Sequence, residues 1–470
     1  MSPESRILTT KLKKKGKNNM QCNVIRNGDV LTVDTFNDLI KYGNRTAMST
    51  QSKPCRYEKI HKIIIKNSKC KMTIDAIKSC LKNIKVFDEL KEIEIVMEDD
   101  RFCTVDGMLY SKNKRRLYFC PRGKEGELVI PEETNTITEY ACSNCAFSTV
   151  IIPNSVKQIG RFAFARSYAL EEVRGCKKIE KICDYAFAYC KFLKKFSFGE
   201  FIKSIGACAF EYTMLTEIYL PEGIYRVGRL AFNTGRLAFN TIWIDDGDST
   251  FAGPSQMYDI HIPSTLKDIG PYAFANAANV YTTFVNAALI HAGTGNGNLE
   301  HCHECNTWKL KIDGKPDVIV PKTINASSHA AKIANKINAT FGLIKNGKLQ
   351  TDKADNVVSE AVIPPELYQY SSDSTGMTAV LEQCRKYPNS SLKRFITKNI
   401  SIIFYNLIDS PTSRNGEEIM VSLIKDGVFT DTALKKLLEE IEQSAKKDSL
   451  ITLKAYAMDT IKHKNNSFTI

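Results

Sequence analysis

Hydrophobic residues recur at a fixed interval along the middle of the chain. The pair Ala-Phe returns every 22 or 23 residues, with one longer step of 42. Its copies are Ala163-Phe164, Ala186-Phe187, Ala209-Phe210, Ala231-Phe232 and Ala273-Phe274, with Ala141-Cys142 as a degenerate first copy. An isoleucine or valine stands four positions before each alanine, and a mostly small residue stands three positions after each phenylalanine position. Columns that keep phase in this way predict a repeat protein whose units stack and share one core.

A second pattern, apolar-x-x-apolar-x-apolar, supplies one short strand per unit. It reads Phe147, Val150, Ile152; Leu193, Phe196, Phe198; Leu215, Ile218, Leu220; and Met257, Ile260, Ile262. Alternation with period two is typical of a half-buried strand. Prolines that follow the strands, such as Pro153 and Pro221, cannot donate to a ladder and end them. The pattern predicts one long parallel sheet along a solenoid, with strands about 4.8 Å apart.

A local duplication supports this register. GRLAFNT at 228–234 is repeated at 235–241, and the second copy begins a further predicted strand, Phe239-x-x-Ile242-x-Ile244. The acidic stretch that follows, 245–256, reads as a loop and does not have the spacing of a calcium-binding loop.

These columns resemble a known family. IPNSVKQIGRFAF (152–164) and LPEGIYRVGRLAF (220–232) are similar to the BspA-like leucine-rich repeat family, as is the hairpin-like stretch 105–131. The resemblance covers about residues 85–285. It implies a solenoid that binds macromolecules, and secreted members of the family act as adhesins. The family supplies no catalytic residues.

The predicted fold is therefore an α+β repeat protein: a leucine-rich-repeat-like solenoid with a parallel β-sheet face, followed by a C-terminal all-α region. The predicted parts are a basic flexible tail (1–20), an N-terminal cap and first irregular repeat (21–89), the solenoid (90–285), a connecting region with short strands (286–373) and the helical region (374–470). In the cap, Ile74, Ile77 and Leu81 predict a helix.

Helical periodicity marks the C-terminal region. One predicted apolar face consists of Ala433, Leu434, Leu437, Leu438, Ile441 and Ala445. Thr430 is placed to cap this helix, and Gly427 suits the end of the preceding one. Leu450, Leu453, Ala457 and Ile461 predict a final helix. Both an ankyrin-like or HEAT-like array and a small capping bundle fit this pattern.

Composition and charge add little to the function. The chain has 470 residues, a formal net charge of +13 and 15 cysteines. No apolar run reaches the length of about 18 residues that a membrane helix needs, and the basic N-terminal stretch is not followed by a signal-peptide core. These features favour free thiols and a cytoplasmic location over a cell-surface one. The basic tail alone is a weak indication of nucleic-acid binding.

Candidate chemistry is sparse. His301, Cys302, His303 and Cys305 form the one metal-like cluster, but no second cysteine pair completes a tetrahedral zinc site. We therefore expect no metal and no cofactor. No histidine lies in a pattern with serine or cysteine that indicates catalysis, so we expect no enzyme. Five cysteines fall on columns of the repeat and are expected to pack in its core: Cys142, Cys145, Cys183, Cys190 and Cys208.

The remaining hypothesis is a protein–protein interaction scaffold. In the strands, the middle residue of each apolar-x-apolar triplet points to the solvent face. At Tyr219, Trp243 and His261 these residues are aromatic on three consecutive predicted strands, which predicts a site for a protein or peptide partner. The alternatives are burial of this stripe by the 245–256 loop, a regulator or effector with activity or nucleic-acid contact through its helical end and tail, and an adhesin-like surface protein exported without a signal peptide.

Overall fold

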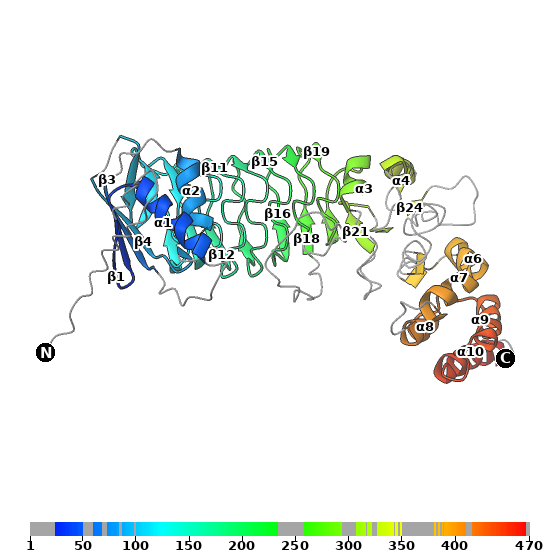
Figure 1. Cartoon of the computed structure of the whole chain (residues 1–470). Helices are drawn as coiled ribbons and strands as arrows, with labels where there is room; N and C mark the ends of the chain where they lie inside the picture. The colour runs from blue at the N-terminus through cyan, green and yellow to red at the C-terminus, as the bar shows by residue number, and fades with distance from the viewer. Residues whose placement is uncertain are drawn as a thin grey trace. The chain divides into compact units, whose positions relative to one another are not determined.

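The computed structural model divides the chain into two compact units, and each is treated by itself. Most of residues 1–234 form the first unit, while 216–220 and 235–470 form the second. The structure describes residues 24–49, 60–67, 73–83, 87–97, 100–233, 258–293, 307–315, 317–321, 327–342, 344–345, 348–349, 380–381, 384–385, 388, 390–409 and 416–466. Figure 1 shows the elements in chain order from blue to red.

The first unit begins with a small α/β cap. Its four-stranded sheet has the order β1-β2-β3-β4, in which β1 and β2 are antiparallel and the others parallel. The elements are β1 (Val24–Asn27), β2 (Val30–Val33), α1 (Phe36–Ser49), β3 (Lys62–Asn67), α2 (Ile74–Asn83) and β4 (Glu92–Met97). The strands alternate, so Ile63, Ile65 and Ile93 lie in the core with the apolar face of α2. The predicted helix at Ile74–Leu81 is confirmed as α2, and Thr73 caps it by accepting the N–H of Ala76 at 3.3 Å.

Two ladders, rather than the single predicted sheet, hold the repeats together. The face sheet of the first unit follows the apolar-x-x-apolar pattern and contains β8 (Glu125–Val129), β10 (Ala146–Ile152), β12 (Glu172–Gly175) and β14 (Lys195–Phe196). The second ladder is made by the column of isoleucine or valine that stands four positions before each alanine, where no strand was predicted. Two-residue strands at this column pair in parallel: β9 (Thr136–Ile137), β11 (Gln158–Ile159), β13 (Lys181–Ile182), β15 (Ser204–Ile205) and β17 (Arg226–Val227). It continues into an antiparallel meander of β5 (Phe102–Val105), β6 (Met108–Ser111) and β7 (Arg116–Phe119).

The Ala-Phe column closes each repeat by a left-handed turn. The residue before every alanine has a positive φ, between 53° and 60°: Tyr140, Phe162, Tyr185, Cys208, Leu230 and Tyr272. A side chain in this conformation costs roughly 1–2 kcal/mol. The turn offsets that cost because its N–H groups bond to the next repeat, as Tyr185 N does to the Ala207 carbonyl at 2.8 Å. The phenylalanine rings then stack in the core, with centroids 4.9 Å apart for Phe164–Phe187 and 5.2 Å for Phe187–Phe210.

Small residues three positions after the phenylalanine position, which we call the small-residue column, make hydrogen bonds to the preceding repeat. Ser167 Oγ donates to the carbonyl of Cys142 at 2.9 Å, and Cys190 Sγ donates to that of Phe164 at 3.1 Å. Each residue satisfies a buried carbonyl of the preceding repeat. Core packing is confirmed for four of the predicted cysteines, Cys142, Cys145, Cys190 and Cys208, whereas Cys183 is only half-buried.

The second unit carries its own sheet, of order β16-β18-β20-β21-β22. The strands are β16 (Glu217–Tyr219), β18 (Tyr258–His261), β20 (Ala277–Tyr281), β21 (Thr307–Lys311) and β22 (Val318–Pro321), all parallel except β22. The short strand β19 (Asp268–Ile269), α3 (Ala287–Gly293), α4 (Ser327–Gly342), β23 (Ile344–Lys345) and β24 (Lys348–Leu349) complete this part. Gly293 is required where it stands, since a Cβ there would lie 2.4 Å from the buried indole of Trp308.

Helices with a common apolar core form the C-terminal part of the second unit. They are α6 (Ser390–Lys398), α7 (Ile400–Phe404), the π-helical turn η4 (Tyr405–Asp409), α8 (Gly416–Lys425), α9 (Asp431–Gln443) and α10 (Ile451–Asn466). The predicted cap is confirmed, because Thr430 Oγ1 accepts the N–H of Ala433 at 3.1 Å. Gly427 ends α8 with a φ of +68°. Ala445 lies beyond α9 and is exposed, so its assignment to the apolar face is wrong.

Candidate binding surface

An aromatic ladder lies on the outer face of the second unit's sheet. Tyr219 of β16 lies directly opposite His261 of β18, which lies opposite Tyr281 of β20. The rings stack face to face, with centroids 4.2 Å apart in both pairs and interplanar angles of 15° and 4°. Lys311 of β21 continues the row, with its ammonium 5.8 Å from the centre of the Tyr281 ring. We call Tyr219, His261, Tyr281 and Lys311 the aromatic ladder.

Buried and exposed residues alternate along these strands, which places the side chains of the ladder on the outer face of the sheet. Ile218, Ile260, Val280 and Leu310 stand one residue before the ladder positions and are at most 1% exposed. Since successive side chains of a strand point to opposite faces, the ladder residues face away from that core. Tyr219 is 57% exposed, and His261 and Tyr281 are half-buried by their own stacking. The ladder is thus a surface feature that packing of the core does not require.

A polar row runs beside the ladder, two residues earlier in each strand. It consists of Glu217, Asp259, Asn279 and Lys309, which are partners in register. The row is acidic at one end and basic at the other. Asn279 Nδ2 donates to Asp259 Oδ1 at 2.8 Å. The Tyr219 hydroxyl donates to the Glu217 carboxylate, and this hydrogen bond, with a smaller effect of burial, raises the pKa of Tyr219, so the phenol stays protonated.

The predicted stripe is only partly described by the structure. Tyr219 and His261 come together as the sequence indicates, but their strands pair directly with each other. The prediction of a strand carrying Trp243 between them is therefore wrong. Trp243 itself lies outside the described residues, as does the acidic stretch 245–256. The sequence reasoning missed Tyr281, which takes the position next to His261.

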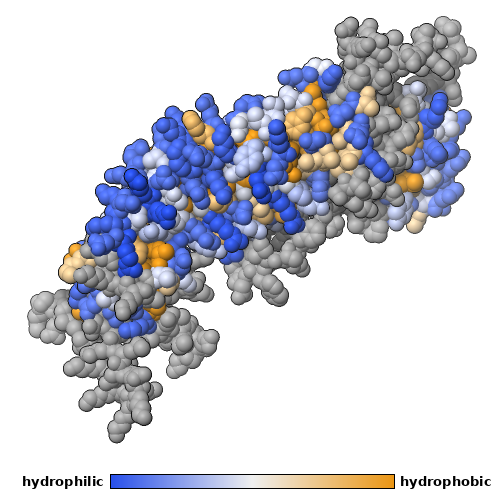
Figure 2. Space-filling view, turned by 90° about the horizontal axis from the view of Figure 1, so that it is seen from above, coloured by the Kyte–Doolittle hydropathy of each residue, from blue (hydrophilic) through white to orange (hydrophobic). Residues whose placement is uncertain are grey.

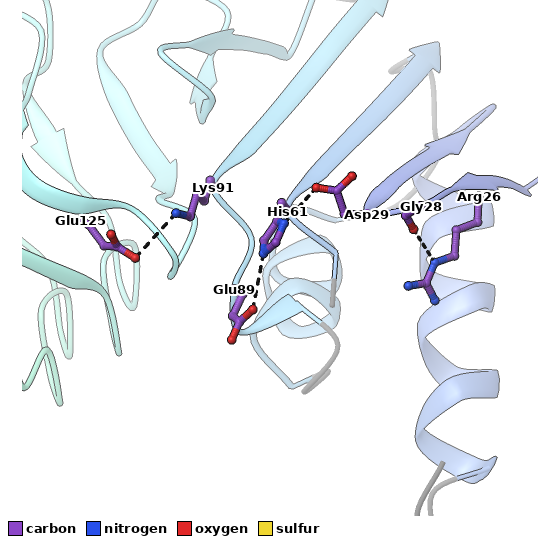
Figure 3. A network of polar contacts seen from close by, with 7 residues as sticks. All are labelled: Arg26, Gly28, Asp29, His61, Glu89, Lys91 and Glu125. Atoms are coloured by element: carbon purple, nitrogen blue, oxygen red, sulfur yellow. Dashed lines mark hydrogen bonds and ion pairs between the residues drawn. The ribbon is translucent and has the colours of Figure 1, made fainter. Parts of the chain in front are cut away.

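A second polar cluster lies just before the first residues of the cap strands β2, β3 and β4. Figure 3 shows His61 between two carboxylates, with Nδ1 2.9 Å from Asp29 Oδ2 and Nε2 3.4 Å from Glu89 Oε2. The hydrogen bond from His61 is the main cause of a lowered pKa of Asp29. All three side chains are about half exposed, and the imidazole joins the turn after β1 to the segment before β4. The cluster contains no nucleophile, so its geometry is that of a clamp between strand ends.

A metal site finds no support in the part of the chain that the structure describes. There, no group of three or more His, Cys, Asp or Glu side chains is arranged to hold a metal ion. The cluster predicted at His301, Cys302, His303 and Cys305 lies outside the described residues. None of the described helices is long and apolar enough to cross a membrane.

Surface hydropathy alone does not single out a site. In the face shown in Figure 2, hydrophilic side chains dominate and hydrophobic ones form separate patches. The exposed large hydrophobic residues of the repeats are likewise scattered, as Val129, Phe192 and Phe201 illustrate. Scattered exposure of this kind is ordinary for folded proteins. The aromatic ladder stands out by its regular order instead.

Comparison with known proteins identifies the repeats. Residues 118–238 and 240–311 match the family described as BspA type leucine rich repeat region, in six copies. No curated protein matches the sequence. Similar solved structures include the pneumococcal vaccine antigen PcpA, at 21% identity over 41% of this chain and 39% of that one, with a TM-score of 0.26. The match therefore spans less than half of that antigen.

Two further solved structures are bacterial leucine-rich repeat proteins. The protein from T. pallidum is 18% identical over 33% of this chain and 68% of its own, with a TM-score of 0.26. The one from Bacteroides ovatus is 18% identical over 48% of this chain and 56% of its own, with a TM-score of 0.32. The family match and the columns of the sequence agree: residues 118–238 and 240–311 of this chain form a BspA-type leucine-rich repeat region.

Proposed function

We propose that this chain is a non-enzymatic interaction protein that binds a segment of a partner protein over the aromatic ladder. The observation that carries the proposal is the ladder itself: three stacked rings on the solvent face of a sheet whose core does not need them. Tyrosine is enriched at the centres of protein interfaces because a rigid ring buries much area at little conformational cost. Repeat solenoids bind through extended sheet surfaces of this kind.

The charge of the neighbouring row supports a particular partner chemistry. Glu217 and Asp259 are register partners on adjacent strands, so two carboxylates lie side by side next to the Tyr219 ring. Like charges that face each other across strands are unfavourable, and a cation relieves them. An arginine or lysine of the partner would pair with these carboxylates and lie against the exposed tyrosine ring. The favoured partner segment is therefore basic at the end that meets β16.

Selection from a library of displayed random peptides tests this proposal with the full chain as bait. We expect the enriched peptides to contain arginine or lysine. We also expect the double variant Glu217→Lys/Asp259→Lys to lose them. The matched control is Glu127→Lys/Glu172→Lys, which changes two carboxylates on the face sheet of the first unit and should retain the same peptides.

Melting curves of both double variants verify that they are folded. Enrichment of the same basic peptides by Glu217→Lys/Asp259→Lys would overturn the proposal, as would enrichment that depends on the control carboxylates instead. A selection that yields no basic peptides would contradict the assigned partner chemistry.

A further inference from the structure

Two thiols stand in the phenylalanine column of the first unit. The N–H of Cys142 bonds to the Ala163 carbonyl at 2.7 Å, as the N–H of Phe164 bonds to that of Ala186 at 2.8 Å. Cys120 repeats the contact one step earlier, because its N–H bonds to the Ala141 carbonyl at 2.7 Å. Cys120, Cys142 and Phe164 are therefore successive members of one column, with side chains that point into the same core.

The spacing of this column suits a disulfide. Neighbouring chain segments joined by such ladders lie about 4.8 Å apart, and the stacked rings further along the column are 4.9 to 5.3 Å apart. A disulfide requires Cα atoms roughly 4.4–6.8 Å apart and side chains that point the same way. Both side chains are at most 1% exposed, so the two sulfur atoms lie in the same enclosed part of the core.

A third thiol lies nearby but has a different role. Cys145 belongs to the small-residue column, and its Sγ lies 3.7 Å from the carbonyl of Cys120. This contact corresponds to the one that Ser167 makes with Cys142. Cys145 thus satisfies a carbonyl of the preceding turn. Among the described residues the three thiols are not arranged to hold a metal ion.

The surroundings make the two column thiols unequal. Burial raises the pKa of the Cys120 thiol, but the neighbouring thiols of Cys142 and Cys145 and the charge of Lys124 lower that pKa overall. Burial and the neighbouring Cys120 raise the pKa of Cys142. Cys120 is therefore the better nucleophile, and Cys142 keeps its proton. Cys190, in contrast, is buried without a thiol partner, and its pKa is raised by burial.

We propose that Cys120 and Cys142 are an oxidation site that closes to a disulfide when the chain meets a peroxide. The Cys120 thiolate attacks one oxygen of hydrogen peroxide, which breaks the O–O bond, forms a sulfenic acid and releases hydroxide. The sulfur of Cys142 then attacks the Cys120 sulfur. The hydroxyl group leaves and takes up the Cys142 proton as water. In total two thiols and one peroxide give one disulfide and two waters.

The bond would join the end of the β5–β7 meander to the first turn of the regular repeats. It closes a loop between positions 120 and 142, both of which are at most 1% exposed in the reduced chain. A cross-link over a loop of this length restricts the unfolded chain and should raise the melting temperature by about 5 °C. Oxidation would then stabilise the N-terminal end of the solenoid.

Peptide mapping of the full chain tests the proposal. The folded protein is treated with hydrogen peroxide, quenched with catalase, alkylated with N-ethylmaleimide and digested with trypsin. We expect one cross-linked pair, made of the tryptic peptides 117–122 and 125–157. Its mass should be that of the two reduced peptides minus two hydrogens plus one N-ethylmaleimide on the remaining thiol, Cys145. This measurement on the natural sequence needs no variant to fold.

Three variants assign the partner of Cys120. The link should persist in Cys145→Ser and in the control Cys190→Ser. In Cys142→Ser it should disappear and leave a sulfenic acid at Cys120 that dimedone traps. Absence of any link to Cys120 in the natural sequence would overturn the proposal, as would a link that survives in Cys142→Ser. A disulfide-linked chain that melts no higher than the reduced chain would contradict its stabilising role.

Discussion

The face sheets of the two units share a backbone plan and differ in what they present to solvent. In the first unit, the row in the position of the ladder is mixed and consists of Val129, Ile151 and Arg174. The Arg174 guanidinium pairs with carboxylates of the neighbouring row, Glu127 at 3.2 Å and Glu172 at 2.8 Å. In the second unit, the corresponding face carries the aromatic ladder. The inner columns are alike, since Val150 and Val173 are as well buried as Ile218 and Ile260. The core thus explains the fold of both sheets, and the outer rows are free to differ.

This difference indicates which outer residues of the repeats are candidates for binding a partner. An arginine and two glutamates that pair with one another have little charge left to offer a partner, and exposed pairs of this kind add little stability. Stacked rings that contribute nothing to the core are available to contact a partner. In the second unit two adjacent carboxylates lie beside them. We expect different effects from substitutions in the buried columns, at a buried carboxylate, at surface ion pairs and in the aromatic ladder.

The largest effect is expected in the inner columns. Ile205→Ala in the first unit and Ile260→Ala in the second should each lower the free energy of unfolding by about 2–5 kcal/mol, through lost transfer energy and a cavity. Both side chains are fully buried. Lys203→Ala, on an exposed position beside Ile205, should change it by no more than about 0.5 kcal/mol. Urea denaturation measures all three, and equal midpoints for Ile205→Ala and Lys203→Ala would refute the register.

A buried carboxylate of the first unit should respond to pH. Burial raises the pKa of Glu211, against the opposing hydrogen bonds of Cys208 and Asn233. A carboxyl whose pKa is higher in the folded state stabilises the fold below its unfolded pKa, and this contribution is lost as pH rises through the folded pKa. Glu211→Gln should therefore raise the free energy of unfolding by about 1 kcal/mol at pH 8, and the gain should shrink towards pH 4. A gain that is independent of pH would contradict this account.

The smallest effect is expected for the charged cluster of Glu127, Glu172 and Arg174 on the outer face of the first unit. Arg174→Ala removes both of its ion pairs, yet the arginine and Glu127 are about half exposed. We expect a loss of no more than about 1 kcal/mol, which should decrease as salt is added. Thermal melting at low and high salt measures it. A larger loss that persists at high salt would show that the charged cluster is structural.

The columns could be predicted from the sequence because a single physical requirement determines the residue type at each of them. The isoleucine, alanine and phenylalanine positions must be apolar to stack, and Thr430 and Gly427 have side chains suited to their positions at helix ends. The second ladder was missed because two-residue strands leave no alternation to detect. The cap strands β1 and β2 and helix α1 were missed because short elements at a terminus show no clear period.

The ladder itself was predicted only in part, for two reasons. The duplicated GRLAFNT segment inserts an extra apparent strand pattern, so the order of strands could not be counted from the sequence. Tyr281 was missed because its strand pattern ends in Thr282 rather than an apolar residue, although Thr282 is only 6% exposed. Accepting threonine at the third position would have revealed it. The cytoplasmic location and the domain boundaries stay predictions.

The central claim is that the ladder serves binding and not folding, and one paired measurement tests it directly. Melting temperature and affinity for a selected basic peptide are measured on the same samples of the natural chain, Tyr219→Ala/Tyr281→Ala and the control Phe201→Ala, which removes an exposed ring elsewhere. We predict that the double variant binds at least about tenfold more weakly, consistent with loss of interface anchors, and melts within about 2 °C of the natural chain, while the control changes neither value. A double variant that melts much lower yet binds the peptide with unchanged affinity would contradict the claim.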